Sequence, residues 1–224
     1  MKKVFKTALF DMDGVLFDSM PGHVIAYRDA LQPHGINMPA EVVYACEGMK
    51  GVDTIQQYGS KMLGRQLSRE EAEMMYEEKC RIFRSLPPAE KIPGVEHLMK
   101  RMKDAGMNVC VVTGSGQVSL LEKLPLKFPG LLTKDRIVCC HDYQHGKPAA
   151  DPYLVGMQRC GTQSSETVVI ENAPLGVRAG KAAGCFTIAV NTGPLDEQVF
   201  IEAGADVVFK SMAEAEAFLM RHYK

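Results

Sequence analysis

The feature that most constrains the fold is an alternation of short apolar runs with amphipathic segments, which fills the chain from residue 93 onward. The runs NVCVV, RIVCC, TVVIEN, CFTIAV and DVVF are typical of buried strands, and helix-type patterns separate them. Strands that alternate with helices in this way favour a parallel, doubly wound sheet. We therefore expect an α/β protein whose parallel sheet is flanked by helices.

One more buried strand is predicted near the N-terminus, where Val4, Phe5 and residues 8–10 are apolar and Lys6 and Thr7 interrupt the run. This strand belongs to the same sheet, although a long segment without convincing strands separates it from the others. We therefore expect a core made of residues 1–17 and 89–224.

The intervening residues 18–88 have helical patterns throughout and are predicted to form an inserted all-helical cap domain. Ser19 followed by Pro21 predicts a capped helix start. Ser68 and Glu71 have the spacing of a capping box, which would open a long helix ending near Ser85. The linkers near 14–19 and 86–92 would let the cap open and close.

Composition excludes several classes of function. With a net charge of −1, the chain has no overall positive field that would attract nucleic acid or an anionic membrane surface. The N-terminus lacks the uninterrupted apolar stretch of a signal peptide, and no segment has membrane-spanning length. The seven cysteines are scattered without a CxxC pair, as expected for reduced core residues. We expect a cytoplasmic monomer without nucleic-acid or membrane partners.

Polar residues follow four of the predicted strands. In a parallel sheet the carboxyl ends of the strands meet at one edge, where ligands bind. Acidic and amide oxygens suit Mg²⁺, while a hydroxyl, backbone N–H groups and a lysine suit phosphate oxygens. The residues at this edge are Asp11, Asp13, Thr113, Gly114, Ser115, Lys147, Glu171 and Asn172.

Each of these residues alone also has a structural explanation. Thr113 could cap a strand end, Lys147 could be a solvated loop charge, and Glu171 with Asn172 could begin the next helix. Chance is a poor explanation for the occurrence of all these residues together, each after its own strand.

The motifs FDMDGVLFDS, VVTGS, GKPAADPY and VIENAPLGVRAG resemble those of the haloacid dehalogenase (HAD) superfamily, in its β-phosphoglucomutase-like branch with a helical C1 cap. The resemblance covers essentially the whole chain and implies a HAD-like Rossmannoid core. It implies that Asp11 attacks phosphorus to form an aspartyl phosphate, and that Asp13 acts first as general acid and then as general base. Thr113 and Lys147 would hold the phosphoryl group, together with Gly114 and Ser115.

The same resemblance implies a Mg²⁺ site formed by Asp11, the Asp13 backbone carbonyl and Asn172. Relatives commonly carry an acidic residue where this chain has Asn172, so the site loses a negative charge. Glu47 of the cap would restore that charge if it reached the metal. His23 and Lys79 of the cap would then bind a second charged group.

This Glu47/Asn172 pairing resembles HAD-type inorganic pyrophosphatases, so pyrophosphate is the leading substrate hypothesis. Taken alone, Glu47 and Lys79 are more commonly solvated helix residues. A sugar-phosphate phosphatase or a β-phosphoglucomutase-like phosphomutase is the alternative, although ACEGMKG offers few neutral hydroxyl groups. A non-catalytic phosphate-binding protein on the same fold also remains open, and a dehalogenase would leave Asp13 without a task.

Overall fold

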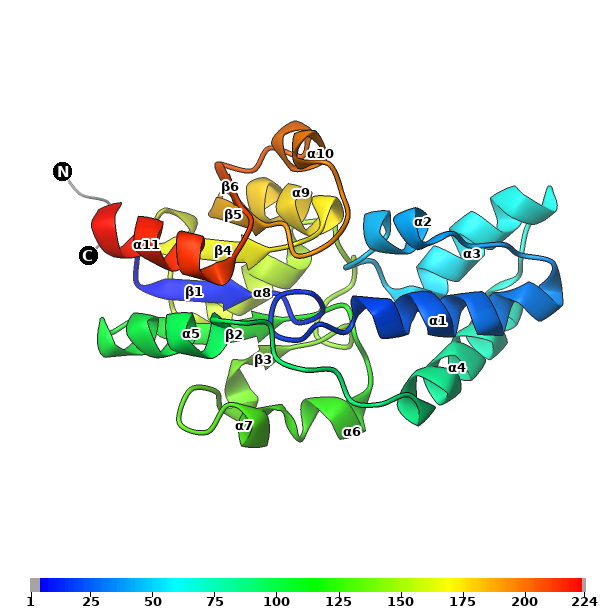
Figure 1. Cartoon of the computed structure of the whole chain (residues 1–224), viewed down its shortest axis with the longest axis horizontal. Helices are drawn as coiled ribbons and strands as arrows, with labels where there is room; N and C mark the ends of the chain where they lie inside the picture. Colours follow the sequence, from blue (N-terminus) through cyan, green and yellow to red (C-terminus); the bar gives the residue numbers. More distant parts are fainter. Residues whose placement is uncertain (1–4, 223–224) are drawn as a thin grey trace.

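The computed structural model describes residues 5–222, apart from the side chains of residues 118 and 119. Its centre is a parallel sheet of six strands in the order β3-β2-β1-β4-β5-β6 (Figure 1). The predicted α/β class with a parallel sheet is confirmed. The strands are β1 (Thr7–Phe10), β2 (Asn108–Val112), β3 (Ile137–Val138), β4 (Thr167–Glu171), β5 (Phe186–Val190) and β6 (Val207–Phe209).

Helices cover both faces of this sheet. Because successive strand residues point to opposite faces, Ala8 and Phe10 of β1 pack with α5 and α11, whereas Leu9 packs with α8 and α9. The core helices are α5 (Val95–Asp104), α6 (Val118–Leu121), α7 (Leu124–Lys127), α8 (Asp151–Cys160), α9 (Pro174–Ala182), α10 (Glu197–Glu202) and α11 (Met212–His222). Short 3₁₀ turns span Lys134–Arg136 and Ser164–Glu166.

Three local expectations differ from the structure. Thr7 does not interrupt the first strand; it is fully buried, and its hydroxyl accepts a hydrogen bond from Thr162 Oγ1 (3.1 Å). The strand predicted over RIVCC is only Ile137–Val138. The helix-type pattern expected between NVCVV and RIVCC is divided into two short helices, α6 and α7, with Pro125 near the start of α7. Val4 lies outside the described residues.

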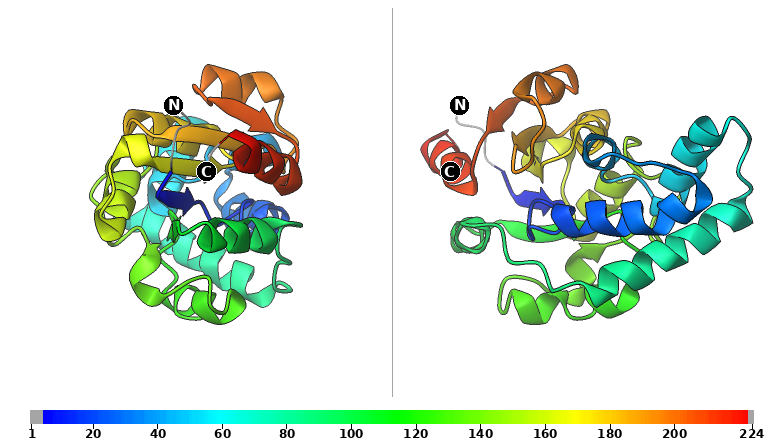
Figure 2. Two further views of the ribbon diagram at one scale, coloured as in Figure 1. Left: turned by 90° about the vertical axis from the view of Figure 1, so that its left-hand side faces the viewer. Right: turned by 45° about the vertical axis from the view of Figure 1, so that its right-hand side comes forward.

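The segment 18–88 is helical and has an apolar cluster of its own, centred on residues such as Leu31, Ile55 and Met75. It contains α1 (Met20–Leu31), a 3₁₀ turn (Gln32–His34), α2 (Ala40–Ala45), α3 (Gly51–Leu63) and α4 (Arg69–Ser85). These helices lie beyond the carboxyl ends of the strands, with α4 returning beside α1 (Figures 1 and 2).

The two connections to the cap run side by side. Asp18 N donates to Glu90 O (2.8 Å), and Ile92 N donates to Leu16 O (3.0 Å). Both crossings between cap and core therefore lie together, as a hinge requires. The domain boundaries at 17/18 and 88/89 stay a prediction.

The capping signals had mixed outcomes. The capping box of Ser68 and Glu71 is confirmed, and α4 ends at Ser85 as expected. Ser19 does occupy the N-cap position of α1, but its side chain makes no capping hydrogen bond. It bonds Asp13 instead, so its hydroxyl belongs to the candidate active site.

Candidate active site

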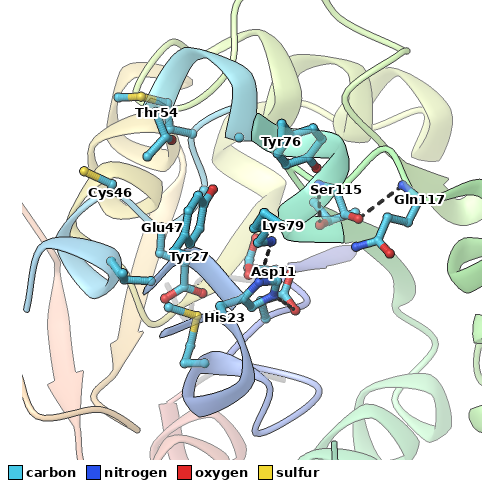
Figure 3. Close-up of a pocket in the computed structure, with 18 residues that line it drawn as sticks. Asp11, His23, Tyr27, Cys46, Glu47, Thr54, Tyr76, Lys79, Ser115 and Gln117 are labelled. Carbon is cyan, nitrogen blue, oxygen red and sulfur yellow. Dashed lines mark hydrogen bonds and ion pairs between the residues drawn. The ribbon is translucent and has the colours of Figure 1, made fainter. Parts of the chain in front are cut away.

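A small cavity lies between the carboxyl edge of the sheet and the cap, with lining residues from both (Figure 3). Its volume is about 60 Å³. Since one water molecule needs roughly 10–15 Å³, this cavity has room for only a few waters. A larger opening of about 740 Å³ adjoins it along the seam between cap and core and shares Gly51, Tyr76, Gly114 and Gln117 with it.

The sheet topology places Asp11 at the centre of the site. β1 lies between β2 and β4, and the chain reverses its direction of progress across the sheet there, which is where open α/β sheets bind ligands. Phe10 pairs with Val111 and Ile170, so Asp11 leaves the sheet between the ends of those two strands.

A buried ionic network fixes this part of the site. Lys147 Nζ donates to Asp11 Oδ1, to Glu171 Oε1 (2.6 Å) and to Val112 O (3.2 Å). Tyr153 OH donates to the same Glu171 oxygen (2.6 Å). The Lys147 side chain is fully buried, so a solvated loop charge is the wrong interpretation.

The network sets the charge state of its members. Burial raises the pKa of Asp11 to about 7, although Lys147 acts in the opposite direction. Burial would lower the pKa of Lys147, but Asp11 and Glu171 outweigh burial and raise it well above its ordinary value. Lys147 is therefore a permanent cation, and a metal ion beside Asp11 would further favour the carboxylate that a nucleophile needs.

Asp13 faces the cap. Its Oδ1 accepts from Ser19 Oγ (2.5 Å) and bonds His23 Nε2 (3.1 Å), while His23 Nδ1 bonds Lys79 Nζ (2.8 Å). An ammonium can only donate, so Nδ1 accepts and we infer that the neutral His23 ring carries its proton on Nε2, toward Asp13. His23 also stacks on Phe83, with ring centroids 4.2 Å apart.

These contacts keep Asp13 ionised. Burial alone would raise the pKa of Asp13, but the hydrogen bonds from His23 and Ser19, together with the nearby Lys79 cation, act in the opposite direction and lower it. This carboxylate is the form that a general base needs. Burial lowers the pKa of Lys79 to about 8, so most of this side chain remains cationic at neutral pH.

The residues that follow β2 line the opposite side of the cavity. Thr113 is buried, and its Oγ1 accepts from Ser115 N (3.0 Å), which leaves the hydroxyl hydrogen able to donate. Gly114 passes close under the cap, because a Cβ there would lie 2.9 Å from Gly48 O. The structure thus brings Thr113, Gly114 and Ser115 to the cavity as expected.

Glu47 is the point at which the cap meets the end of β4. Asn172 Nδ2 donates to Glu47 Oε2 (2.8 Å), and both side chains are buried. Gly14, with φ of +78°, passes so close to Asn172 that no side chain would fit there. Glu47 and Lys79 are 8% and 3% exposed, so neither is the solvated residue that its sequence context favours.

Two buried oxygens at this contact have no donor. Within residues 5–222, no hydrogen-bond partner reaches Glu47 Oε1 or Asn172 Oδ1. Burial raises the pKa of Glu47 well above its ordinary value, and Asp11 and Glu171 raise it further. Unpaired buried acceptors among several carboxyl groups are costly unless a cation is present.

The charge of the site agrees with a divalent cation. The carboxyl groups of Asp11, Asp13, Glu47 and Glu171 lie at or beside the cavity, whereas Lys79 and Lys147 are the two buried lysines among the described residues. Over the described part of the chain, no three His, Cys, Asp or Glu side chains are placed to hold a metal by themselves. A divalent cation there would also take the amide oxygen of Asn172 and a backbone carbonyl as ligands, and hard oxygen donors of this kind fit Mg²⁺.

Several functional contacts had weak sequence signals. Tyr153 lies just after the GKP motif, but nothing in the sequence shows that it bonds Glu171. Tyr27, Thr54 and Tyr76 of the cap also line the cavity. These hydroxyl-bearing residues weaken the expectation, drawn from ACEGMKG alone, that the cap has few neutral partners for a sugar.

Comparisons with known proteins agree with this fold and site. Residues 8–190 match the family model for haloacid dehalogenase-like hydrolases. The chain is 32% identical to hexitol phosphatase A of Escherichia coli, with 93% of this chain and 92% of that protein covered. It is 28% identical to the fructose-1-phosphate phosphatase of the same species, over 81% of this chain and 94% of the relative.

A solved Bacteroides vulgatus structure, assigned as a beta-phosphoglucomutase, has a TM-score of 0.92 and 40% identity over 98% of this chain and 89% of its own. The core motifs, the parallel sheet and the family match together place the protein in one class of enzyme. The chain belongs to the haloacid dehalogenase-like hydrolase family, in its β-phosphoglucomutase-like branch. Among the residues described, no helix is both long and apolar enough to cross a membrane.

Proposed function

We propose that this protein is a Mg²⁺-dependent phosphohydrolase that acts through an aspartyl phosphate on Asp11. The observation that carries the proposal is the buried contact of Asp11 with Lys147, beside Asp13 at the carboxyl edge of the sheet. A binding protein would have no need for a nucleophile and an acid/base residue with a single residue between them.

In the proposed reaction a carboxylate oxygen of Asp11 attacks phosphorus, and the bond to the leaving oxygen breaks. Asp13 gives that oxygen a proton, which it must first acquire as the negative substrate approaches. In the second step Asp13 takes a proton from water, and the water oxygen attacks phosphorus and releases Asp11. Lys147 and the Thr113 hydroxyl stabilise the charge on the phosphoryl oxygens in both steps.

Asp11, Asn172, Glu47 and the backbone carbonyl of Asp13 would hold Mg²⁺. The metal would polarise the phosphoryl group as a Lewis acid. The unpaired oxygens of Glu47 and Asn172 support this ligand set. If Glu47→Ala left turnover and its dependence on Mg²⁺ intact, Glu47 would not be a ligand.

The side chains on the cap favour a small substrate with an anionic leaving group, of which pyrophosphate is the simplest. Within the described chain, the hydrogen bonds of the Lys79 ammonium go only to His23, and the rings of Tyr27 and Phe83 lie 4.7 and 5.2 Å from it. A buried cation with donors to spare is suited to a second phosphate. The small volume of the cavity also suits a compact leaving group.

Sugar or polyol phosphates are the second candidate class, and the comparisons support this class better than pyrophosphate. The relatives described above are named for hexitol phosphate and fructose 1-phosphate. Tyr27, Thr54 and Tyr76 could bond the hydroxyl groups of such a leaving group. A phosphomutase reaction on the same substrates would use the same Asp11 chemistry.

The deciding experiment measures phosphate release by the purified protein with Mg²⁺, on pyrophosphate and on a panel of hexose, hexitol and glycerol phosphates. Asp11→Asn serves as the blank. The substrate class is the one with the highest kcat/KM. Release without a bisphosphate activator identifies a hydrolase, and isomerisation that needs an activator identifies a mutase. No Asp11-dependent turnover on any compound would contradict the proposed function.

A further inference from the structure

The seam between cap and core contains a cation that the proposed chemistry does not use. Lys50 Nζ donates to the backbone carbonyls of Gln144 (2.9 Å) and Tyr143 (3.1 Å), which lie more than ninety positions away in the core. Its ammonium also lies 5.1 Å from the centre of the Tyr143 ring. Lys50 is half-buried, and within residues 5–222 no carboxylate pairs with it.

The position of Lys50 on its own helix is unfavourable. It is the N-cap residue of α3, and its side chain makes no capping hydrogen bond. A helix N-terminus carries partial positive charge and favours an anion or a Ser, Thr, Asp or Asn side chain. A lysine there does not stabilise α3, so its contacts across the seam are the better explanation of its presence.

The segment that Lys50 holds joins two groups of the active site. Tyr143 is buried, and its hydroxyl donates to the backbone carbonyl of Thr113 (3.0 Å). Four residues further along the chain, Lys147 reaches Asp11. One ammonium on the cap thus bonds the stretch that links the two phosphoryl-binding side chains of the core.

The seam around this contact is tightly packed. A Cβ at Gly146 would lie 3.1 Å from Lys50 Cγ, and a Cβ at Gly48 would lie 2.8 Å from Lys147 Cδ. These contacts exist only while the cap is closed, because Lys50 and Gly48 belong to the cap and Lys147 to the core. On opening, water would replace Lys50 at both carbonyls at little net cost.

We propose that Lys50 is a positioning residue that, on cap closure, bonds the 143–147 segment and so holds Thr113 and Lys147 in the geometry needed for phosphoryl transfer. The inference rests on the proposed phosphohydrolase function, because it assigns Lys50 a part in the same reaction. Lys50 acts through the backbone and touches no reacting atom.

The test compares three variants in the full-length protein. Lys50→Met keeps the aliphatic stem and removes the donors, Lys50→Arg keeps donors, and Lys61→Met removes an exposed lysine from the end of the same helix. On the best substrate we expect Lys50→Met to lower kcat about tenfold with KM changed less than about threefold. Lys50→Arg should recover most of the loss, and Lys61→Met should match the unmodified protein.

A second measurement does not depend on activity. Amide hydrogen exchange of the free protein should become faster at Asp142, next to this segment, and at His145, within it, in Lys50→Met but not in Lys61→Met. The two amides donate to Cys139 O (2.9 Å) and to Asp151 Oδ2 (3.1 Å). Exchange in β1 and α5 should not change. If Lys50→Met destabilises the whole protein, Lys50→Gln is measured in its place.

If Lys50→Met had the same kcat as Lys61→Met, the inference would be overturned. The inference would also be overturned if kcat of Lys50→Met fell without faster amide exchange in the 143–147 segment, or if exchange became faster throughout the cap. If no phosphate compound is turned over, the proposed function fails, while the exchange experiment still decides whether Lys50 holds the segment.

Discussion

The two walls of the cavity differ in how completely their charged groups are paired. On the core wall, Lys147 bonds both Asp11 and Glu171, and Tyr153 completes the contacts of Glu171. On the cap wall, Glu47 keeps one oxygen without a donor, and Lys79 makes a single hydrogen bond within the described residues. The ionic network of the core wall is complete by itself, whereas the cap wall, together with the unpaired Asn172 Oδ1 of the core that faces it, is completed by what binds there.

This difference separates chemistry from selectivity. The core wall contains the groups that the family's phosphoryl chemistry needs, and its ionic network holds them in place without substrate. The unpaired groups of the cap lie where the leaving group and the metal would be. Changes in the core wall should therefore affect all substrates alike, and changes in the cap wall should depend on substrate or metal.

The largest effect is expected for Asp11→Asn. The amide has nearly the same shape but cannot act as the nucleophile, so turnover of every substrate should fall at least about 10⁴-fold. Stability should be kept or raised, because burying a carboxylate is costly. Phosphate release and the urea unfolding midpoint measure the two quantities. Residual activity within about tenfold of the unmodified protein would exclude Asp11 as nucleophile.

Lys147→Met should affect both activity and stability. It leaves Asp11 and Glu171 buried together without their cation, which should cost about 3 kcal/mol in the free energy of unfolding. Turnover should fall about 10³-fold on all substrates. Denaturant unfolding and phosphate release check these values, with Lys181→Met, at a partly exposed ion pair with Asp206, as the matched control. Equal destabilisation by the two variants would show that the core network stabilises the protein no more than a partly exposed ion pair does.

Lys79→Met tests the cap wall and the class of substrate together. Loss of a buried cation should lower kcat/KM for pyrophosphate about 100-fold. For a polyol phosphate, whose leaving group is neutral, kcat/KM should fall by less than about threefold. The ratio of the two kcat/KM values is the measurement. Equal losses would mean that Lys79 acts through His23 and Asp13 rather than on the leaving group.

Glu47→Gln should act on the metal. Replacing one charged oxygen ligand by an amide should raise the Mg²⁺ concentration for half-maximal activity about tenfold. Removal of Mg²⁺ by a chelator should abolish turnover in both proteins. Glu41→Gln, an exposed residue of α2, is the control. An unchanged Mg²⁺ dependence in Glu47→Gln would remove Glu47 from the ligand set.

The smallest effect is expected for Ser68→Ala, which removes the capping box at the start of α4, away from the cavity. It should lower the free energy of unfolding by about 1 kcal/mol and leave kcat and KM unchanged. Thermal unfolding and steady-state kinetics provide the comparison. A change in kcat would show that cap stability and the cap wall of the site are coupled.

The sequence predicts much of the core wall because local rules control it. A buried parallel strand ends where its apolar run ends, so Asp11, Thr113 and Glu171 follow from strand prediction and the common carboxyl edge. The capping box at Ser68 is equally local. Thr7 departs from this pattern, because its burial depends on a hydrogen bond to Thr162, a residue distant in sequence.

The partners of the cap residues could not be predicted from local sequence. Ser19 has the signal of a helix cap, yet its hydroxyl bonds Asp13. Lys79 is on an amphipathic helix, where a lysine is usually solvated, but it is buried beneath His23 and three aromatic rings. These outcomes depend on how the cap helices pack with one another and on the core.

The sequence by itself determined the parallel α/β core, the inserted helical segment and the acidic, hydroxyl and lysine residues at one edge of the sheet. The tertiary structure alone decided that Glu47 meets Asn172 and that Lys50 bonds the segment before Lys147. The physical reason is the distance along the chain over which each kind of interaction acts. Periodicity and capping act over a few residues, whereas these contacts join positions separated by about a hundred residues and form only when the cap docks on the core.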